Sequence, residues 1–338
     1  MQLAAVLLTS ALAAGLTAVT IPLLIKQAEA LSLLDTPCQR SVHFRPVPRG
    51  AGIAFVASSL LVLALFDKNH LNGFWWIYIA MLVILVTGIL DDRHELTPKI
   101  KFLGILAATA LIWEGGLRID QVGNYLGFDL SLGWLAFPFT YFAVAGFTNA
   151  LNLIDGLDGL AGGIAWMILA FFFWLGWVHH DHFLIIFSSV FLASVTVFLF
   201  FNWHPAKIFM GDSGSLSLGF LISVLSIYAL KYIPSVSVLF IGLYPIVDTL
   251  VAMIRRKRSG RSASQPDRCH IHHLILNRFG RVPQSVLLII VLQTFGLLTA
   301  VLIPEGTNQA PLLIFFALIL WLTYRWVLKE IRRQGLEC

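Results

Sequence analysis

The chain has 338 residues, of which 58% are hydrophobic and 12% are charged. Because soluble domains carry charge on about a quarter of their residues, this composition excludes two or three soluble domains in a row. The formal net charge of +5 does not indicate a nucleic-acid partner, since the placement of basic residues in a membrane protein says more than their total. We expect a polytopic membrane protein that lies in a lipid bilayer and binds no nucleic acid.

Apolar runs of about 17 to 24 residues recur along the chain, and each is long enough as a helix to cross a hydrocarbon core of roughly 30 Å. We predict eleven membrane-spanning helices within residues 1–338. With the N-terminus outside, all Lys and Arg residues except Lys68, Arg118 and Lys231 fall on the cytoplasmic side, as the positive-inside rule requires. The sequence thus predicts an all-α polytopic membrane protein with one integral-membrane domain, 1–338, and a cytoplasmic C-terminus.

The three cysteines, Cys38, Cys269 and Cys338, are all assigned to the cytoplasmic side by this orientation. Thiols stay reduced in that compartment, and an odd number of cysteines allows no complete pairing. We therefore expect no disulfide bond.

The first polar loop follows the first apolar run and contains three prolines, which prevent a regular helix between residues 33 and 52. His43 and Arg49 lie in this loop, close to the membrane face. Arginine binds phosphate oxygens in a bidentate manner, so the loop could hold a diphosphate. The alternative is that its basic residues only fix the orientation in the membrane.

The third apolar run ends directly in Asp91 and Asp92. Two carboxylates at a helix C-terminus oppose the helix dipole and cost stability, which favours a functional role. Lys101 follows after a short loop, where it could neutralise a phosphate or extend to the membrane interface.

The stretch NALNLIDGLDGLAGG at 149–163 interrupts the apolar pattern with two amides, two carboxylates and four glycines. Asp155 and Asp158 are three residues apart and share a face, so they repel each other unless a cation lies between them. Asn149 and Asn152 precede them at helical spacing. A divalent metal and backbone N–H groups would form a phosphate site here. Alternatively, the glycines are packing positions and the carboxylates are helix caps.

The stretch FNWHPAKIFMGDSGS at 201–215 contains Asn202, Lys207, Phe209 and Asp212. A carboxylate at a helix N-terminus is electrostatically favourable, so Asp212 could be a simple N-cap. An N-cap, however, does not require the neighbouring amide, lysine and aromatic residue. We interpret this stretch as a second part of the same site.

The longest loop contains a basic run at 255–261, expected to anchor the topology, and then His270, His272 and His273. Three imidazoles within four residues suit the binding of phosphates better than a zinc site, which would need further ligands nearby.

The polar loops all fall on the cytoplasmic face, which predicts one active site at the membrane boundary. A transporter would instead place polar residues near the bilayer midplane in repeated broken helices. Clustered carboxylates with Lys, Arg and His indicate phosphoryl transfer assisted by Mg²⁺ or Mn²⁺. No GxxxxGK[ST] stretch is present, so an ATP-driven P-loop enzyme is not expected.

Four stretches carry a family resemblance: the DD pair at 91–92, the two long motifs at 149–163 and 201–215, and HIHH at 270–273. In this order they resemble the polyprenyl-phosphate N-acetylhexosamine-1-phosphate transferase superfamily over nearly the whole chain. The resemblance implies transfer of an N-acetylhexosamine 1-phosphate from a UDP-sugar to undecaprenyl phosphate. The products would be undecaprenyl-diphospho-sugar and UMP, in the initiating step of cell-surface glycan synthesis at the cytoplasmic (inner) membrane of a bacterium.

The resemblance also implies roles for individual residues. Asp212 resembles the family's Mg²⁺ ligand, and Asn202 matches an amide near that metal. Phe209 matches the aromatic residue on which uracil stacks, and Asp155 the carboxylate that helps to read uracil. Asp91 resembles the base, or in another view the nucleophile, that acts on the carrier phosphate. The catalytic set is Asp91, Asp92, Asp212, His272 and His273, and the substrate-binding set is Arg49, Lys101, Asn149, Asn152, Asp155, Asp158, Asn202, Lys207, Phe209 and His270.

The HIHH motif and eleven spans are similar to the WecA/TagO branch, whereas the MraY branch has three contiguous histidines and ten spans. Ile271 therefore argues against UDP-MurNAc-pentapeptide and favours UDP-GlcNAc. Ser41, where the family usually has Lys, and Gly50-Ala51, where it has Gly-Gly, depart from the pattern. Other UDP-N-acetylhexosamine donors, such as UDP-GalNAc or a diamino sugar, stay open, as do a non-catalytic lipid or nucleotide-sugar transporter and a homodimer.

Overall fold

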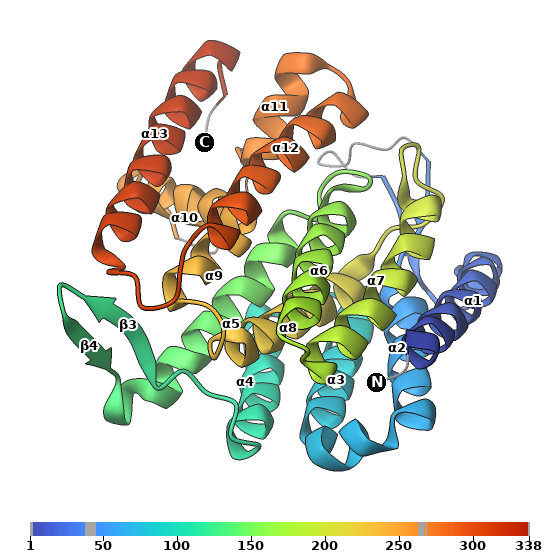
Figure 1. The fold of residues 1–338 in the computed structure, drawn as a ribbon. Coiled ribbons are helices and arrows are strands. Elements are labelled where there is room, and N and C mark those ends of the chain that lie inside the picture. Colours follow the sequence, from blue (N-terminus) through green and yellow to red (C-terminus); the bar gives the residue numbers. More distant parts are fainter. Residues whose placement is uncertain (1–2, 38–44, 263–266, 268, 337–338) are drawn as a thin grey trace. The chain divides into compact units, whose positions relative to one another are not determined.

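The computed structural model describes residues 3–37, 45–262, 267 and 269–336, without the side chains of residues 68–71. His43 and Ser41 of the first loop therefore lie outside the described residues. The described chain is mostly helical (Figure 1). It divides into two compact units, Met1–Ile119 with Gly133–Ala229 (unit 1) and Asp120–Leu132 with Leu230–Cys338 (unit 2).

Within its described residues, unit 1 is a bundle of eight helices with one short strand pair. The two-residue strands β1 and β2 are antiparallel, with Leu34 opposite Pro48. The elements of unit 1 are α1 (Leu3–Gln27), β1 (Leu34–Asp35), β2 (Val47–Pro48), α2 (Ala51–Phe66), α3 (Lys68–His94), α4 (Pro98–Glu114), a 3₁₀ turn (Gly133–Leu135), α5 (Ala136–Leu153), α6 (Leu160–Val178), α7 (His182–Asn202) and α8 (Gly211–Ala229).

Helix α8 forms the core of unit 1 and packs against α2, α3, α5 and α6 (Figure 1). All its residues from Ser213 to Ile227 are buried. A helix enclosed on all sides can carry serines only if their hydroxyl groups find partners, and Ser217 donates to the carbonyl of Ser213 at 2.6 Å. The most buried helix of unit 1 is thus the one that begins at the GDSG motif.

Two glycines allow the backbones of α2 and α3 to touch the start of α8. A Cβ atom at Gly52 would lie 2.0 Å from the backbone nitrogen of Gly214, and one at Gly88 would lie 2.4 Å from the Cα of Ser213. Only glycine permits so close an approach. The start of α2 and the last turns of α3 therefore converge on the first turn of α8.

The described part of unit 2 forms an antiparallel hairpin and five helices. Its strands pair Gln121 with Ser131. The hairpin is tied to the helices through Gln309, whose Oε1 accepts from the backbone N–H of Val236 at 3.0 Å. The elements of unit 2 are β3 (Gln121–Tyr125), β4 (Phe128–Ser131), α9 (Ser235–Ile241), α10 (Leu243–Arg258), α11 (Ile271–Phe279), α12 (Val282–Val301) and α13 (Ala310–Gln334).

Helices α9 and α10 form one apolar segment that bends by 85°. The fully buried Gln293 of α12 satisfies the broken backbone: its Nε2 donates to the carbonyl of Ile241 at 2.6 Å, and its Oε1 accepts from the N–H of Tyr244 at 3.1 Å. Backbone groups freed by a break inside a membrane must find such partners within the protein.

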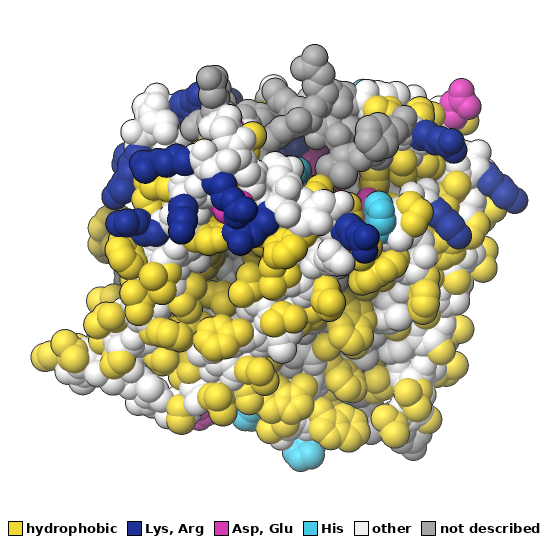
Figure 2. Space-filling model, turned by 90° about the horizontal axis from the view of Figure 1, so that it is seen from above, with side chains coloured by type: hydrophobic (Ala, Val, Ile, Leu, Met, Phe, Trp, Pro, Cys, Tyr) yellow, Lys and Arg dark blue, Asp and Glu magenta, His cyan; other side chains and the backbone are white. Residues whose placement is uncertain are grey.

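Seven helices within the described residues are long and apolar enough to cross a membrane, and the bent pair α9/α10 could form an eighth. The predicted number of eleven is not reached. The apolar runs that make the difference form α2 and α4, of 16 and 17 residues, and α5, which does not meet the same standard of length and apolarity. The chain is a multi-pass membrane protein, and hydrophobic side chains cover much of the face drawn in Figure 2.

The expectation of no disulfide bond is wrong, because Cys269 is disulfide-bonded. The other two cysteines, Cys38 and Cys338, lie outside the described residues. The expectation was based on the redox state of a compartment, which carries no information about which sulfur atoms the fold brings together.

Candidate active site

The centre of the candidate site is an ammonium group between two carboxylates. Asp91 lies at the end of α3, Asp212 in the first turn of α8 and Lys101 in the first turn of α4. The Nζ of Lys101 lies 2.8 Å from Oδ2 of Asp91 and 2.5 Å from Oδ2 of Asp212. Residues that are 111 positions apart in the sequence thus form one charged cluster.

Asp92 has a different surrounding from Asp91, although the two are adjacent. Its Oδ1 accepts from the backbone N–H of Asp212 at 2.7 Å and its Oδ2 from that of Ser213 at 3.0 Å. The side chain is 2% exposed. The first N–H groups of a helix lack intrahelical partners and carry partial positive charge, so a carboxylate there stabilises the helix end. Asp92 therefore fixes the start of α8 and with it the position of Asp212.

An amide on α5 completes the surroundings of Asp212. The Nδ2 of Asn152 donates to Oδ1 of Asp212 at 3.0 Å and to the hydroxyl of Ser215 at 2.9 Å. Asn149 lies one turn earlier on the same helix and is half-buried. The family motif had pointed to Asn202 as the amide near the metal, whereas the structure places Asn152 against Asp212.

The positions of Asp91 and Asp212 fit a divalent cation whose coordination is completed by substrate. The Lys101 ammonium shows that a positive charge can contact both carboxylates at once. Mg²⁺ is typically held by one or two carboxylates together with water and substrate phosphates. Within the described part of the chain, no three His, Cys, Asp or Glu side chains are grouped to hold a metal by themselves.

A second network joins the turn between α5 and α6 to the loop between α7 and α8. Oδ2 of Asp158 lies 2.7 Å from Nδ1 of His204 and accepts from the N–H of Ala206 at 3.1 Å. Asn202 accepts from the N–H of Gly159 and donates to the carbonyl of Ile208, both at 2.9 Å. Asp158 and Asn202 thus hold the two motif loops together.

Asp155 lies between these networks, in the turn that follows α5. Burial raises its pKa to about 8, and the nearby carboxylates of Asp212, Asp92 and Asp158 act in the same direction. A carboxyl group with such a pKa is largely protonated at pH 7 and can donate a hydrogen bond. This property suits a group that reads a polar ligand.

Backbone hydrogen bonds join the first polar loop, which precedes α2, to the loop between α7 and α8. The N–H of Phe209 donates to the carbonyl of Pro48 at 2.8 Å, and the N–H of Ala51 donates to the carbonyl of Phe209 at 3.1 Å. The ring of Phe209 is half-buried, and Lys207 is exposed. The Nε of Arg49 is buried and has no hydrogen-bond partner among the described residues. Arg49, Lys207 and Phe209 thus belong to one pair of connected loops.

The three histidines belong to unit 2, where α11 begins. His270 donates from Nδ1 to Oδ2 of Asp248 at 2.6 Å, and Arg256 donates to its Nε2 at 3.1 Å. Arginine is only a donor, so Nε2 must accept and the proton of His270 lies on Nδ1. Burial, together with His273, lowers the pKa of His272 to about 3, so its imidazole is neutral at pH 7.

Part of the basic run at 255–261 is buried, contrary to the expectation of a topology anchor. Arg255 and Arg256 are 2% and 4% exposed and both bind Oδ2 of Asp267, at 2.7 and 2.6 Å. Although partial burial opposes ionisation, these hydrogen bonds lower the pKa of Asp267 to about 2. Sequence reasoning missed this cluster, because charge counting does not distinguish a buried arginine from one at the interface.

The structure brings together the predicted residues of unit 1 in three connected groups. Asp91, Lys101, Asn152 and Asp212 form the first group, in which Asp92 accepts from the backbone N–H of Asp212. Sequence reasoning missed Ser215, which lies one helical turn after Gly211 and accepts from Asn152. The GDSGS spacing was the signal that could have revealed it.

Comparison with known proteins identifies the same region. Residues 74–230 match the family described as "Glycosyl transferase family 4". This stretch includes the whole carboxylate cluster. The histidines of α11 lie outside this match.

Three relatives match most of the chain. A probable undecaprenyl-phosphate N-acetylglucosaminyl 1-phosphate transferase of Bacillus subtilis is 35% identical over 89% of this chain and 86% of its own length. An undecaprenyl-phosphate alpha-N-acetylglucosaminyl 1-phosphate transferase of Escherichia coli K12 is 29% identical over 90% and 86%. A decaprenyl-phosphate N-acetylglucosaminephosphotransferase of Mycobacterium tuberculosis is 33% identical over 78% and 74%. The chain therefore belongs to the polyprenyl-phosphate N-acetylhexosamine-1-phosphate transferase superfamily, in glycosyl transferase family 4.

Proposed function

We propose that the protein transfers N-acetylglucosamine 1-phosphate from UDP-GlcNAc to undecaprenyl phosphate, which gives undecaprenyl-diphospho-GlcNAc and UMP. The names of the three relatives support this donor sugar and a polyprenyl-phosphate acceptor. The observation that carries the proposal is the Asp91–Lys101–Asp212 cluster at the start of α8. Such a cluster suits a reaction in which phosphate charge must be neutralised.

The reaction exchanges one phosphorus–oxygen bond for another. An oxygen of the carrier phosphate bonds to the phosphorus that bears the sugar, while the bond from that phosphorus to the bridging oxygen breaks. UMP leaves with that oxygen and the electron pair. A Mg²⁺ or Mn²⁺ ion held by Asp91 and Asp212 would supply charge neutralisation for the diphosphate.

The chain's own groups would position the reactants. Asp92 would hold the first turn of α8 in place, so that Asp212 keeps its orientation. Lys101 would place a fixed positive charge beside the reacting phosphates, and Asn152 would orient Asp212. The carboxylate of Asp91 would accept a proton from the carrier phosphate when that phosphate binds as a monoanion.

The donor's base and phosphates would use the outlying residues. We propose that Phe209 stacks on uracil and that protonated Asp155 donates a hydrogen bond to it. The imidazoles of His272 and His273 would donate hydrogen bonds to phosphate oxygens, and Arg49 and Lys207 would provide positive charge. The half-buried ring of Phe209 and the raised pKa of Asp155 support these roles.

We propose that α2, α4 and α5 also cross the bilayer, which would restore the eleven spans expected from the sequence. The N-terminus would lie outside and the C-terminus in the cytoplasm, in the cytoplasmic membrane of a bacterium. The homodimer is a further proposal, and the mass of the purified protein in detergent would test it.

The test is UMP release by purified protein with undecaprenyl phosphate, comparing UDP-GlcNAc, UDP-GalNAc and UDP-MurNAc-pentapeptide. We expect release from UDP-GlcNAc that stops with EDTA and returns with Mg²⁺. Asp212→Asn should abolish it, and Asp129→Asn, a substitution in the exposed β4 strand, should not. UMP release from one of the other two donors would support the proposed reaction but show that the donor sugar is not GlcNAc. A folded protein that releases UMP from none of the three would contradict the proposal.

A further inference from the structure

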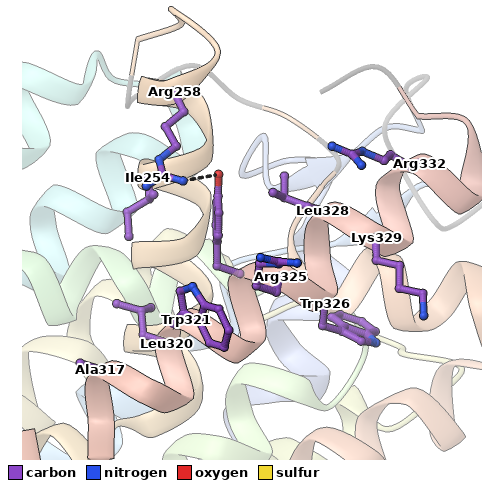
Figure 3. Close-up of a pocket in the computed structure, with 11 residues that line it drawn as sticks. Ile254, Arg258, Ala317, Leu320, Trp321, Arg325, Trp326, Leu328, Lys329 and Arg332 are labelled. Atoms are coloured by element: carbon purple, nitrogen blue, oxygen red, sulfur yellow. Dashed lines mark hydrogen bonds between the residues drawn. The ribbon is translucent and has the colours of Figure 1, made fainter. Parts of the chain in front are cut away.

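A groove between α10 and α13 of unit 2 is lined by none of the residues assigned to the reaction above. Its volume is about 1000 Å³, within the range of ligand pockets. Figure 3 shows Ile254 and Arg258 on α10 facing a run of α13 side chains that includes Trp321 and Arg325. The floor is apolar, with Ala317 and Leu320 among the lining residues.

The rim of this groove is strongly positive. Among the described residues that line it there are four cations and no carboxylate. The acidic residue within this stretch of α13, Glu330, is buried elsewhere, 3.2 Å from Arg278 and 3.8 Å from Arg333. The four cations are Arg258, Arg325, Lys329 and Arg332.

Three cations of α13 lie on the same face of the helix as a tryptophan and follow it along the chain as a stripe. Trp321, Arg325, Lys329 and Arg332 follow one another at intervals of three or four positions, so they share one face of the helix, and all four are exposed. Tryptophan at the level of lipid headgroups and cations just beyond it are typical of a membrane interface. The stripe thus runs from an interfacial aromatic residue to three positive charges.

Aromatic rings hold two of the guanidinium groups in place. The guanidinium of Arg258 lies 5.1 Å from the ring centroid of Tyr324 and donates to its hydroxyl at 3.3 Å. The guanidinium of Arg325 lies 5.5 Å from the ring centroid of Trp321. Cation–π contacts of this kind orient a guanidinium without neutralising its charge. The groove therefore presents fixed positive charge with its hydrogen-bond donors still available.

We propose that this groove binds the headgroup of an anionic phospholipid of the surrounding bilayer. The phosphate would lie among the four cations, and an acyl chain would lie along Ala317, Leu320 and Trp321. A soluble anion has no apolar part that could contact the apolar floor, whereas a phospholipid has its acyl chains. A second copy of this chain that packed its α13 stripe against this one would bring like charges together, which opposes association.

The test compares two double variants that remove equal charge from the same two helices. Arg258→Gln with Arg332→Gln removes two cations of the groove. The control, Lys257→Gln with Arg333→Gln, removes two cations that are adjacent to Arg258 and Arg332 in the sequence but do not line the groove. Delipidated protein is titrated with phosphatidylglycerol or phosphatidylcholine, and bound lipid is counted by native mass spectrometry.

We expect the wild type and the Lys257/Arg333 variant to retain phosphatidylglycerol and to bind phosphatidylcholine weakly. The Arg258/Arg332 variant should bind phosphatidylglycerol more weakly by on the order of tenfold. Arg258→Lys with Arg332→Lys keeps the charge and should restore binding, which separates loss of charge from loss of fold.

Equal loss in both glutamine variants would overturn the proposal, because binding would then follow surface charge in general. Equal retention of phosphatidylcholine would also overturn it, as would competition by inorganic phosphate that displaces the lipid completely. A change from dimer to monomer in the Arg258/Arg332 variant, with unchanged lipid binding, would assign the groove to a second copy instead.

Discussion

The ammonium of Lys101 is the positive charge that the chain itself supplies between Asp91 and Asp212. Two carboxylates that face each other without a cation repel, so the cluster needs either this lysine or a metal ion. Both can serve in turn if the lysine moves toward the substrate phosphates when the metal binds. Lys101 is therefore placed to neutralise the two carboxylates before substrate binds and the substrate phosphates afterwards.

Replacing Lys101 by Met should lower kcat of UMP release about 100-fold or more, the usual cost of removing one group that stabilises transition-state charge. Lys99→Met is the matched control, because Lys99 lies in the same first turn of α4 and is exposed. Initial rates at saturating substrate measure both. Equal rates for the two variants would contradict the role given to Lys101.

Asp92→Asn should act through the position of α8 and not through the chemistry. It removes a charge from the helix N-terminus and turns an NH₂ group toward a backbone N–H, which costs about 1–3 kcal/mol. Thermal unfolding in detergent should therefore shift to lower temperature. Asp91→Asn should abolish UMP release with little thermal shift, because the carboxylate of Asp91 accepts one backbone hydrogen bond among the described residues, from Leu96. The reverse pattern would exchange the roles of the two residues.

The raised pKa of Asp155 makes a prediction about stability and pH. With a pKa of about 8 in the folded protein and about 4 when unfolded, Asp155 binds a proton between these pH values only in the folded state. Its contribution to stability is therefore present below pH 4 and decreases as the pH rises toward 8. Asp155→Asn should flatten this slope in thermal unfolding measured with EDTA. An unchanged slope would contradict the raised pKa.

At the scale of elements, the first turn of α8 depends on glycines in other helices. Gly52→Ala should unfold or strongly destabilise the protein, by more than the roughly 1–3 kcal/mol of ordinary overpacking, because its Cβ would lie 2.0 Å from a backbone nitrogen. Gly146→Ala is the control, since a Cβ there meets no atom within 4 Å. The yield of monodisperse protein measures both. A well-folded Gly52→Ala protein would show that α2 and α8 are not so closely packed.

The sequence predicted these elements unevenly. Apolar runs identified the helices, because the bilayer requires continuous apolar segments, but not which runs would fold as the short helices α2 and α4. The break between α9 and α10 was not predicted. It depends on Gln293, a residue 51 positions beyond Gly242 in the sequence, and a partner so distant leaves no local signal.

At the scale of the molecule, motif reading found the residues of the cluster but not their pairing. Asp91, Asp212 and Lys101 were recognisable because carboxylates and lysine stand out in an apolar chain. That Asn152 and not Asn202 contacts Asp212 depends on how α5 crosses α8, which sequence spacing does not determine. The buried Arg255, Arg256 and Asp267 were missed for the same reason.

The central claim is that a phosphorylated sugar, and not the sugar alone, moves to the lipid. The most direct measurement uses UDP-GlcNAc labelled with ³²P in the phosphate that bears the sugar, together with undecaprenyl phosphate and Mg²⁺. We predict that the label moves to the lipid and that the released nucleotide is unlabelled UMP. Labelled UDP in solution, with an unlabelled glycolipid, would contradict the account.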